Sequence, residues 1–99
     1  MPGYKVRLAR SAADRVINIT SKDDARRVAS RLQALQTFPY QGAPYEPAYA
    51  AARPPHPVRA TFAGHFGIYY TVDDDKRLVN VEYIEDCRMD PTNRFVDNE

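Results

Sequence analysis

The sequence holds only two histidines and one cysteine, the residue types that most readily supply a base or a nucleophile near neutral pH. An imidazole ionises near neutral pH, so His65 is a candidate general acid or base. Cys87 adjoins Arg88 but no histidine, and we interpret it as a small buried residue rather than an activated thiol. Two histidines and one cysteine are too few for a structural zinc site, and three adjacent carboxylates at 73–75 cannot converge on one ion. We therefore expect no metal and no cofactor.

A second group of chemically capable residues is a cluster of arginines between positions 26 and 31. Apolar residues recur at spacings of three and four through this segment, which predicts a helix with one apolar stripe. The stripe consists of Ala25, Val28, Ala29, Leu32 and Leu35. Arg26, Arg27 and Arg31 then lie on the other face, where they form either a solvated surface or a basic patch that binds an acidic or nucleic-acid partner.

The elements that position these residues are predicted from hydrophobic periodicity. Three runs between Val58 and Ile84 alternate with a period of two, and short turns at 63–65 and 73–76 separate them, which predicts an antiparallel three-stranded meander. In each run, alternate residues are expected to share one face of the strand. These sets are, for the first run, Val58, Ala60 and Phe62; for the second, Phe66, Ile68, Tyr70 and Val72; and for the third, Val79, Val81 and Tyr83. A meander of this kind has one apolar face that another layer must cover.

The amino-terminal third supplies that layer. Residues 4–9 alternate as a strand does. A serine three residues before an acid marks a helix start twice, at Ser11 and at Ser21. These signals predict a short helix that ends near Ile19 and a longer one from Lys22 to about Gln36.

The remaining segments and the composition set limits on the class of protein. Six prolines between positions 38 and 57 exclude a continuous helix or a central strand there, although 47–53 could form one or two helical turns. The chain has 99 residues and a net charge of +1, which gives no overall attraction to nucleic acid. With one cysteine, no apolar run long enough for a bilayer and no signal-peptide core, we expect a cytoplasmic protein without a membrane partner.

Two stretches resemble the RelE/ParE toxin superfamily. YKVRLARSAADRV at 4–16 is similar to that family's first strand and helix start, and HFGIYYTVDDDKRLVNVEYIEDCRMDP at 65–91 is similar to its strand, acidic turn, strand and closing basic segment. The resemblance implies an α+β fold in one domain over residues 1–99. The order would be an N-terminal strand, a two-helix hairpin and an antiparallel three-stranded meander, with the helices packed on one sheet face and flexible ends at 1–3 and 92–99.

The resemblance also implies a toxin of a toxin–antitoxin pair, silenced by a cognate antitoxin. RelE-like members cut mRNA on the ribosome without a metal, which requires a base, an acid and cations for the phosphorane charge. The matching candidates here are Arg59, His65 and Arg88, with Tyr69 and the three helical arginines as RNA- or target-binding residues. Gly67 stands where RelE-like ribonucleases carry an arginine, so the catalytic set is incomplete.

Three functions therefore stay open. The leading hypothesis is a growth-arresting toxin, for which Gly67 and the near-neutral charge favour a protein-binding mode such as the gyrase inhibition of ParE-like members. The runner-up is a ribosome-dependent, metal-independent mRNA endoribonuclease that uses Arg59, His65 and Arg88. The third is a non-toxic protein-interaction domain on the same scaffold.

Overall fold

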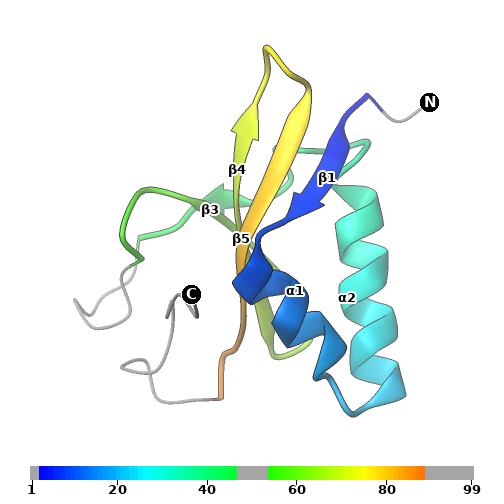
Figure 1. Cartoon of the computed structure of the whole chain (residues 1–99). Helices are drawn as coiled ribbons and strands as arrows, with labels where there is room; N and C mark the ends of the chain where they lie inside the picture. The colour runs from blue at the N-terminus through cyan, green and yellow to red at the C-terminus, as the bar shows by residue number, and fades with distance from the viewer. Residues whose placement is uncertain (1–2, 47–53, 89–99) are drawn as a thin grey trace.

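The computed structural model describes residues 3–46 and 54–88, which form two helices and one mixed sheet (Figure 1). The strands are β1 (Lys5–Leu8), β2 (Ala43–Pro44), β3 (Arg59–Ala63), β4 (Phe66–Asp73) and β5 (Leu78–Asp86), and the helices are α1 (Arg10–Ile17) and α2 (Lys22–Ala34). The sheet order is β1-β5-β4-β3-β2. The expected α+β architecture and the antiparallel β3–β4–β5 meander are confirmed, while β1 joins the sheet parallel to β5. The expected flexible ends and the possible helical turns at 47–53 lie wholly or mostly outside the described residues.

The two predicted helix starts had different outcomes. Ser21 caps α2, since its side-chain oxygen accepts the backbone N–H of Asp24 at 3.3 Å. The cap predicted at Ser11 is wrong, because α1 begins at Arg10 and the Ser11 hydroxyl instead donates to the backbone oxygen of Glu82 on β5. That contact fastens α1 to the sheet. Both helices also end about two residues earlier than predicted.

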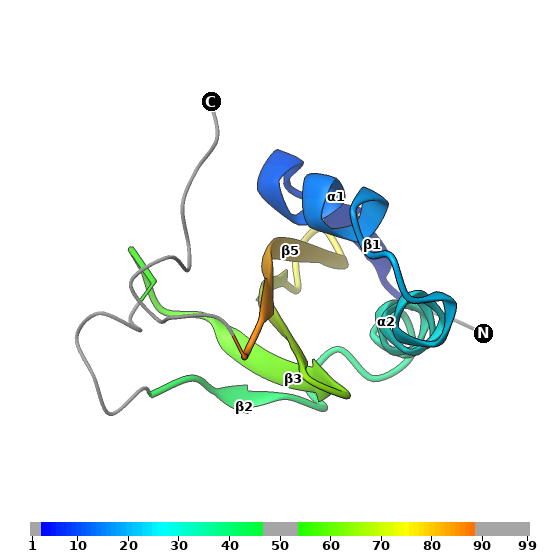
Figure 2. The same cartoon turned by 90° about the horizontal axis from the view of Figure 1, so that it is seen from below.

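The main core lies between the helices and one face of the sheet (Figure 2). Val28 of α2 and Leu35, the residue that directly follows α2, are fully buried, as the apolar stripe predicted, whereas Ala29 is exposed. Because a buried aliphatic side chain gains roughly 1.5–3 kcal/mol from leaving water, this layer supplies much of the driving force for folding. Its fully buried members also include Ala12, Ile68, Tyr70, Val79, Val81 and Ile84.

A β-bulge in β5 gives the sheet a second buried cluster. Tyr69 pairs with Tyr83 but Tyr70 pairs with Val81, so Glu82 is an extra residue on β5. An extra residue reverses the alternation beyond it. The expectation that Val79, Val81 and Tyr83 share one face is therefore wrong, since Tyr83 lies on the face turned away from the helices.

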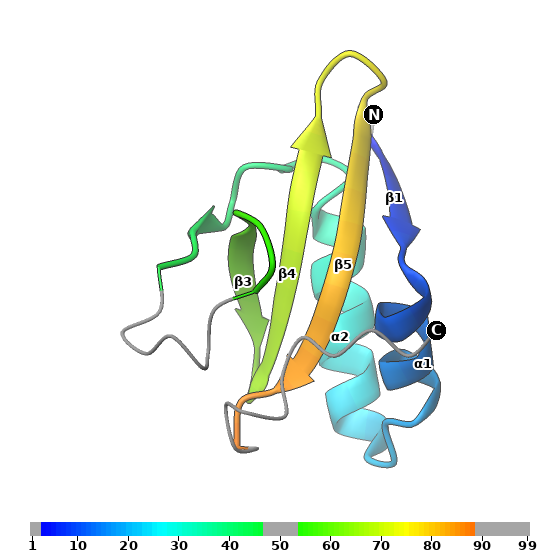
Figure 3. The ribbon, with the colours of Figure 1, turned by 60° about the vertical axis from the view of Figure 1, so that its left-hand side comes forward.

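We call this second face the open face and define it by its buried cluster of Val58, Ala60, Tyr69 and Tyr83, with Tyr45 packed against them. The expectation of a single apolar face is thus also wrong. Figure 3 shows the long β4 and β5 strands in front, with α2 behind them on the other side of the sheet. Among the described residues, no helix has the length and apolarity needed to cross a membrane.

Candidate functional site

Three of the predicted site residues, Arg27, His65 and Arg88, lie close together at one end of the sheet. They come from the first half of α2, the β3–β4 turn and the segment after β5. Gly64, with a φ of 62°, makes the left-handed turn that precedes His65. The His65 Nε2 atom lies 3.5 Å from an Asp24 carboxylate oxygen on α2 and 3.9 Å from an Asp86 oxygen on β5. The His65 backbone oxygen also accepts the N–H of Cys87 at 2.8 Å. The turn is therefore anchored to both neighbouring elements.

Two arginines complete the arrangement. Arg27 donates to Asp24 at 3.3 Å, and Arg88 makes a forked contact with Asp86, with its shortest N···O distance 2.7 Å. Arg27, Asp24, His65, Asp86 and Arg88 thus form one continuous line of ionisable side chains, two guanidiniums and two carboxylates with an imidazole between them, which we call the charge network. Two carboxylates that the sequence did not single out hold the three predicted residues together.

The forked contact with Arg88 lowers the pKa of Asp86 to about 2, against the smaller opposing effect of burial. Because an unfolded aspartate ionises near pH 4, the stability that this pair contributes is present above about pH 4 and is lost as the pH falls toward 2.

We expect Arg88→Gln to raise the pKa of Asp86 toward its ordinary value, because the charged hydrogen bonds are removed. Carbonyl-carbon NMR titration of Asp86 measures the shift directly, and Arg10→Gln, on the exposed start of α1, serves as the control. An unchanged Asp86 pKa in Arg88→Gln would show that the Arg88 contact does not control it.

A basic groove adjoins the charge network. It has a volume of about 470 Å³ and lies between α2 and the end of β3, with Arg27 common to both features. Its lining consists of Arg26, Arg27, Ser30, Arg31, Ala34, Ala63 and Gly64. The three arginines predicted as a target-binding patch thus lie along one hollow rather than on a flat helix surface.

Arg59 lies apart from this site. Arg59 pairs directly with Tyr70 and therefore projects to the same side of the sheet as that residue. It is separated from His65 by the length of β3, about 13 Å. Its guanidinium donates to the Gly42 backbone oxygen at 2.6 Å and lies 4.7 Å from the ring centre of Tyr40. Arg59 therefore holds the segment that leads into β2.

Asp74 also holds the segment between α2 and β2 in place. The hydroxyls of Tyr4 and Tyr40 donate to its two carboxylate oxygens at 2.7 and 2.5 Å. These bonds lower the pKa of Asp74, and the same contact raises the pKa of Tyr40 to about 12. One carboxylate of the predicted polar turn thus ties the amino terminus and the α2–β2 connection to the β4–β5 hairpin.

Tyr69, predicted to contact a target, is only 1% exposed. Its ring packs edge-on against Tyr45, with the ring centres 4.9 Å apart. A Cβ atom at Gly67 would lie 2.5 Å from the Tyr69 hydroxyl oxygen and 2.7 Å from the ring carbon that bears it. Gly67 therefore leaves the space that the Tyr69 ring occupies, and Tyr69 is a packing residue of the open face.

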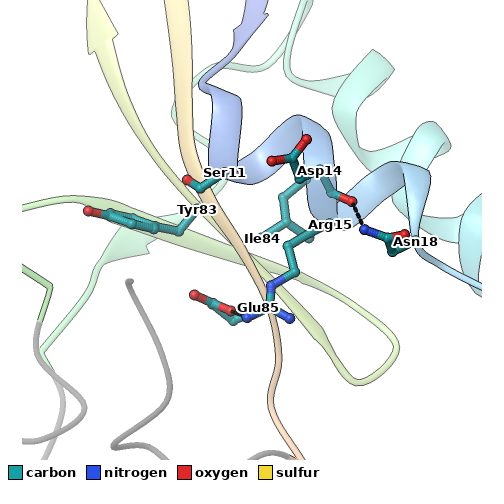
Figure 4. A pocket seen from close by; sticks show the side chains of 7 residues that line it. All are labelled: Ser11, Asp14, Arg15, Asn18, Tyr83, Ile84 and Glu85. Atoms are coloured by element: carbon teal, nitrogen blue, oxygen red, sulfur yellow. Dashed lines mark hydrogen bonds and ion pairs between the residues drawn. The ribbon is translucent and has the colours of Figure 1, made fainter. Parts of the chain in front are cut away.

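Two carboxylates of β5, Glu82 and Glu85, have basic partners. Glu82, at the bulge, accepts the Thr71 hydroxyl at 3.2 Å and lies 2.5 Å from His56 Nε2. A hollow of about 180 Å³ separates α1 from the neighbouring end of β5, and Arg15 reaches across it to within 3.0 Å of Glu85, which is 3% exposed (Figure 4). Sequence reasoning missed the pairing of His56 with Glu82, because only the bulge brings the carboxylate to this position.

Within residues 3–46 and 54–88, no group of three histidine, cysteine or acidic side chains is placed to hold a metal ion.

Solved structures with the same arrangement of elements come from toxin–antitoxin complexes. A chain of the archaeal RelE–RelB complex from Pyrococcus horikoshii OT3 superimposes with a TM-score of 0.68 at 12% identity, covering 86% of this chain and 96% of that one. A chain of the RelBE2 toxin–antitoxin complex from Mycobacterium tuberculosis gives a TM-score of 0.66 at 20% identity, covering 87% and 93%. No protein-family model matches the sequence, and no curated protein matches it. The chain has the RelE-like fold of these toxin–antitoxin structures.

Proposed function

We infer that this chain is the toxin of a two-component toxin–antitoxin pair, that it acts in the cytoplasm to arrest growth, and that a cognate antitoxin neutralises it. The observation that carries the inference is the likeness to two complexes of such pairs over nearly the whole of both chains. A fold by itself hosts many functions, so the mode of action has to be argued from this chain's own residues.

The arrangement of charge favours action through protein binding, with DNA gyrase as one possible target. Arg26, Arg27 and Arg31 line the basic groove, while the buried cluster of the open face consists of aliphatic and tyrosine side chains with the Glu82 carboxylate next to it. The exposed Arg7 lies beside Glu82 at the β1 edge of that face. Cleavage of RNA at the open face would require cations to stabilise the phosphorane charge, and removing one such group typically costs 10²–10³-fold in rate. Gly67 supplies none, and Arg59 is engaged elsewhere.

Metal-independent endoribonuclease activity remains the second candidate because one observation favours it. His65 and Arg88 share Asp86, so a potential acid–base group and a guanidinium lie at the same end of the sheet. If this site cleaves ribosome-bound mRNA, His65→Ala and Arg88→Ala abolish growth arrest while the free energy of unfolding changes little. In the protein-binding mode, both variants keep most of their effect on growth.

Induced expression in a bacterial host tests the proposal. We expect growth to stop after induction and to resume when a neighbouring reading frame that encodes the antitoxin is expressed with the chain. Soluble expression with unchanged growth would contradict the toxin assignment and favour the non-toxic interaction domain. Solubility and circular dichroism of the purified chain provide the control, because an unfolded chain also leaves growth unchanged.

A further inference from the structure

The basic groove contains an arginine that no carboxylate neutralises among the described contacts. Arg26 and Arg27 each have an acidic partner one helical turn away, Asp23 and Asp24, at 3.5 and 3.3 Å. The Arg26–Asp23 pair is exposed on both sides, and such pairs contribute little to stability. The Arg31 guanidinium instead donates to the neutral side-chain oxygen of Gln41 at 3.0 Å. Arg31 therefore carries the excess positive charge of the groove.

The other lining residues indicate what kind of anion fits. Ala34, Ala63 and Gly64 give the groove a small, partly apolar floor, and its lining includes no aromatic ring on which a nucleic-acid base could stack. A side chain on Gly64 would approach Arg27 and narrow the groove, because a Cβ there would already lie 3.7 Å from Arg27 Cδ. The groove suits closely packed aliphatic and carboxylate groups better than bases.

An exposed aromatic residue, Phe38, follows the carboxyl end of α2, where Ala34 lines the groove. Phe38 is 64% exposed, and its backbone N–H donates to the Ala34 oxygen at 2.9 Å. Aromatic residues and arginines are enriched at protein interfaces. Phe38 can therefore serve as an apolar anchor beside the charged groove.

We propose that the basic groove binds an acidic segment of a partner protein, with carboxylates on Arg31 and Arg27 and an apolar side chain against Phe38. Charge complementarity carries the proposal, and the small aliphatic lining of the groove itself favours a polypeptide over RNA. The identification of this partner as the antitoxin rests on the proposed function. The binding of an acidic segment in the groove does not depend on that function.

The test uses the whole folded chain and a synthetic helical peptide with glutamates spaced four residues apart and leucines on one face. We expect this peptide to shift the amide NMR signals of Ser30, Ala34, Ala63 and Gly64, with an affinity that falls as salt screens the charges. A peptide with glutamine at the same positions should bind at least tenfold more weakly. Single-stranded RNA of equal charge should leave these signals unchanged.

Two charge reversals provide matched variants. Arg31→Glu is expected to weaken peptide binding more than tenfold, whereas Lys5→Glu, which changes the net charge equally from the exposed β1 edge, should leave it within twofold. Arg31→Lys should retain most of the binding because the charge is kept. The amide spectrum of each variant confirms its fold.

Three results would overturn the proposal: peptide-induced shifts elsewhere on the surface, equal weakening by Arg31→Glu and Lys5→Glu, or groove shifts with RNA but not with the peptide. Growth arrest without peptide binding would refute the groove inference alone. Peptide binding without growth arrest would refute the toxin assignment and leave the groove inference standing.

Discussion

Replacing Gly67 with arginine is expected to lower the free energy of unfolding by about 2–3 kcal/mol rather than to create a ribonuclease. Gly67 is buried in β4, and a Cβ atom there would approach the Tyr69 ring far inside van der Waals contact. The ring cannot move easily because Tyr45 packs against it, and its close neighbours Ala60 and Tyr83 are also buried. Urea denaturation of the purified variant measures the loss.

A double-mutant cycle isolates the cause of that loss. Gly67→Ala introduces only the Cβ atom and should cost about 1–3 kcal/mol in the natural background. In a Tyr69→Leu background the same change should cost much less, because the obstructing ring is gone. Equal costs in the two backgrounds would show that the Tyr69 ring is not what excludes a side chain at position 67.

Truncating Ile68 to alanine is expected to destabilise the chain by about 2–5 kcal/mol. Ile68 is fully buried in the layer between the sheet and the helices, so its loss leaves a cavity that the surrounding core fills only partly. For a domain of this size a loss near the upper end approaches the whole free energy of unfolding. Thermal and urea unfolding of the variant, compared with the natural chain, provide the measurement.

Ile17→Ala is the matched control, because it removes the same atoms from a residue that is 77% exposed at the end of α1. We expect it to change the free energy of unfolding by less than about 0.5 kcal/mol. Similar losses in the two variants would contradict the placement of the main core.

Local signals in the sequence predicted the structure correctly where the interaction that they describe is itself local. Ser21 caps α2 within the same turn of chain, and the alternation of β3 and β4 directly gives two antiparallel neighbours. Ser11 has the same local signature, but the backbone oxygen of Glu82 offered its hydroxyl a partner 71 residues away. Such competition between a local and a distant partner cannot be decided from spacing alone.

The candidate site was predictable only in part, for the same reason. The three helical arginines share a surface because helix periodicity places them there, and they do line one groove. By contrast, the uninterrupted alternation in β5 gives no warning of the bulge, which changes the side to which Tyr83 points. That Arg59 lies apart from His65 depends on its pairing with β4, which the sequence does not show. The joining carboxylates, Asp24 and Asp86, come from elements distant in sequence.

Pulse labelling of cells shortly after induction tests the proposed toxin function and its proposed protein-binding mode together. Protein synthesis and DNA synthesis are followed side by side, with mRNA ends mapped in the same samples. For a toxin that acts through protein binding, we expect protein or DNA synthesis to stop without new mRNA ends within codons, with DNA synthesis stopping first if gyrase is the target. An early halt of translation with new ends within codons would contradict the protein-binding mode, and unchanged synthesis of both kinds would contradict the toxin assignment itself.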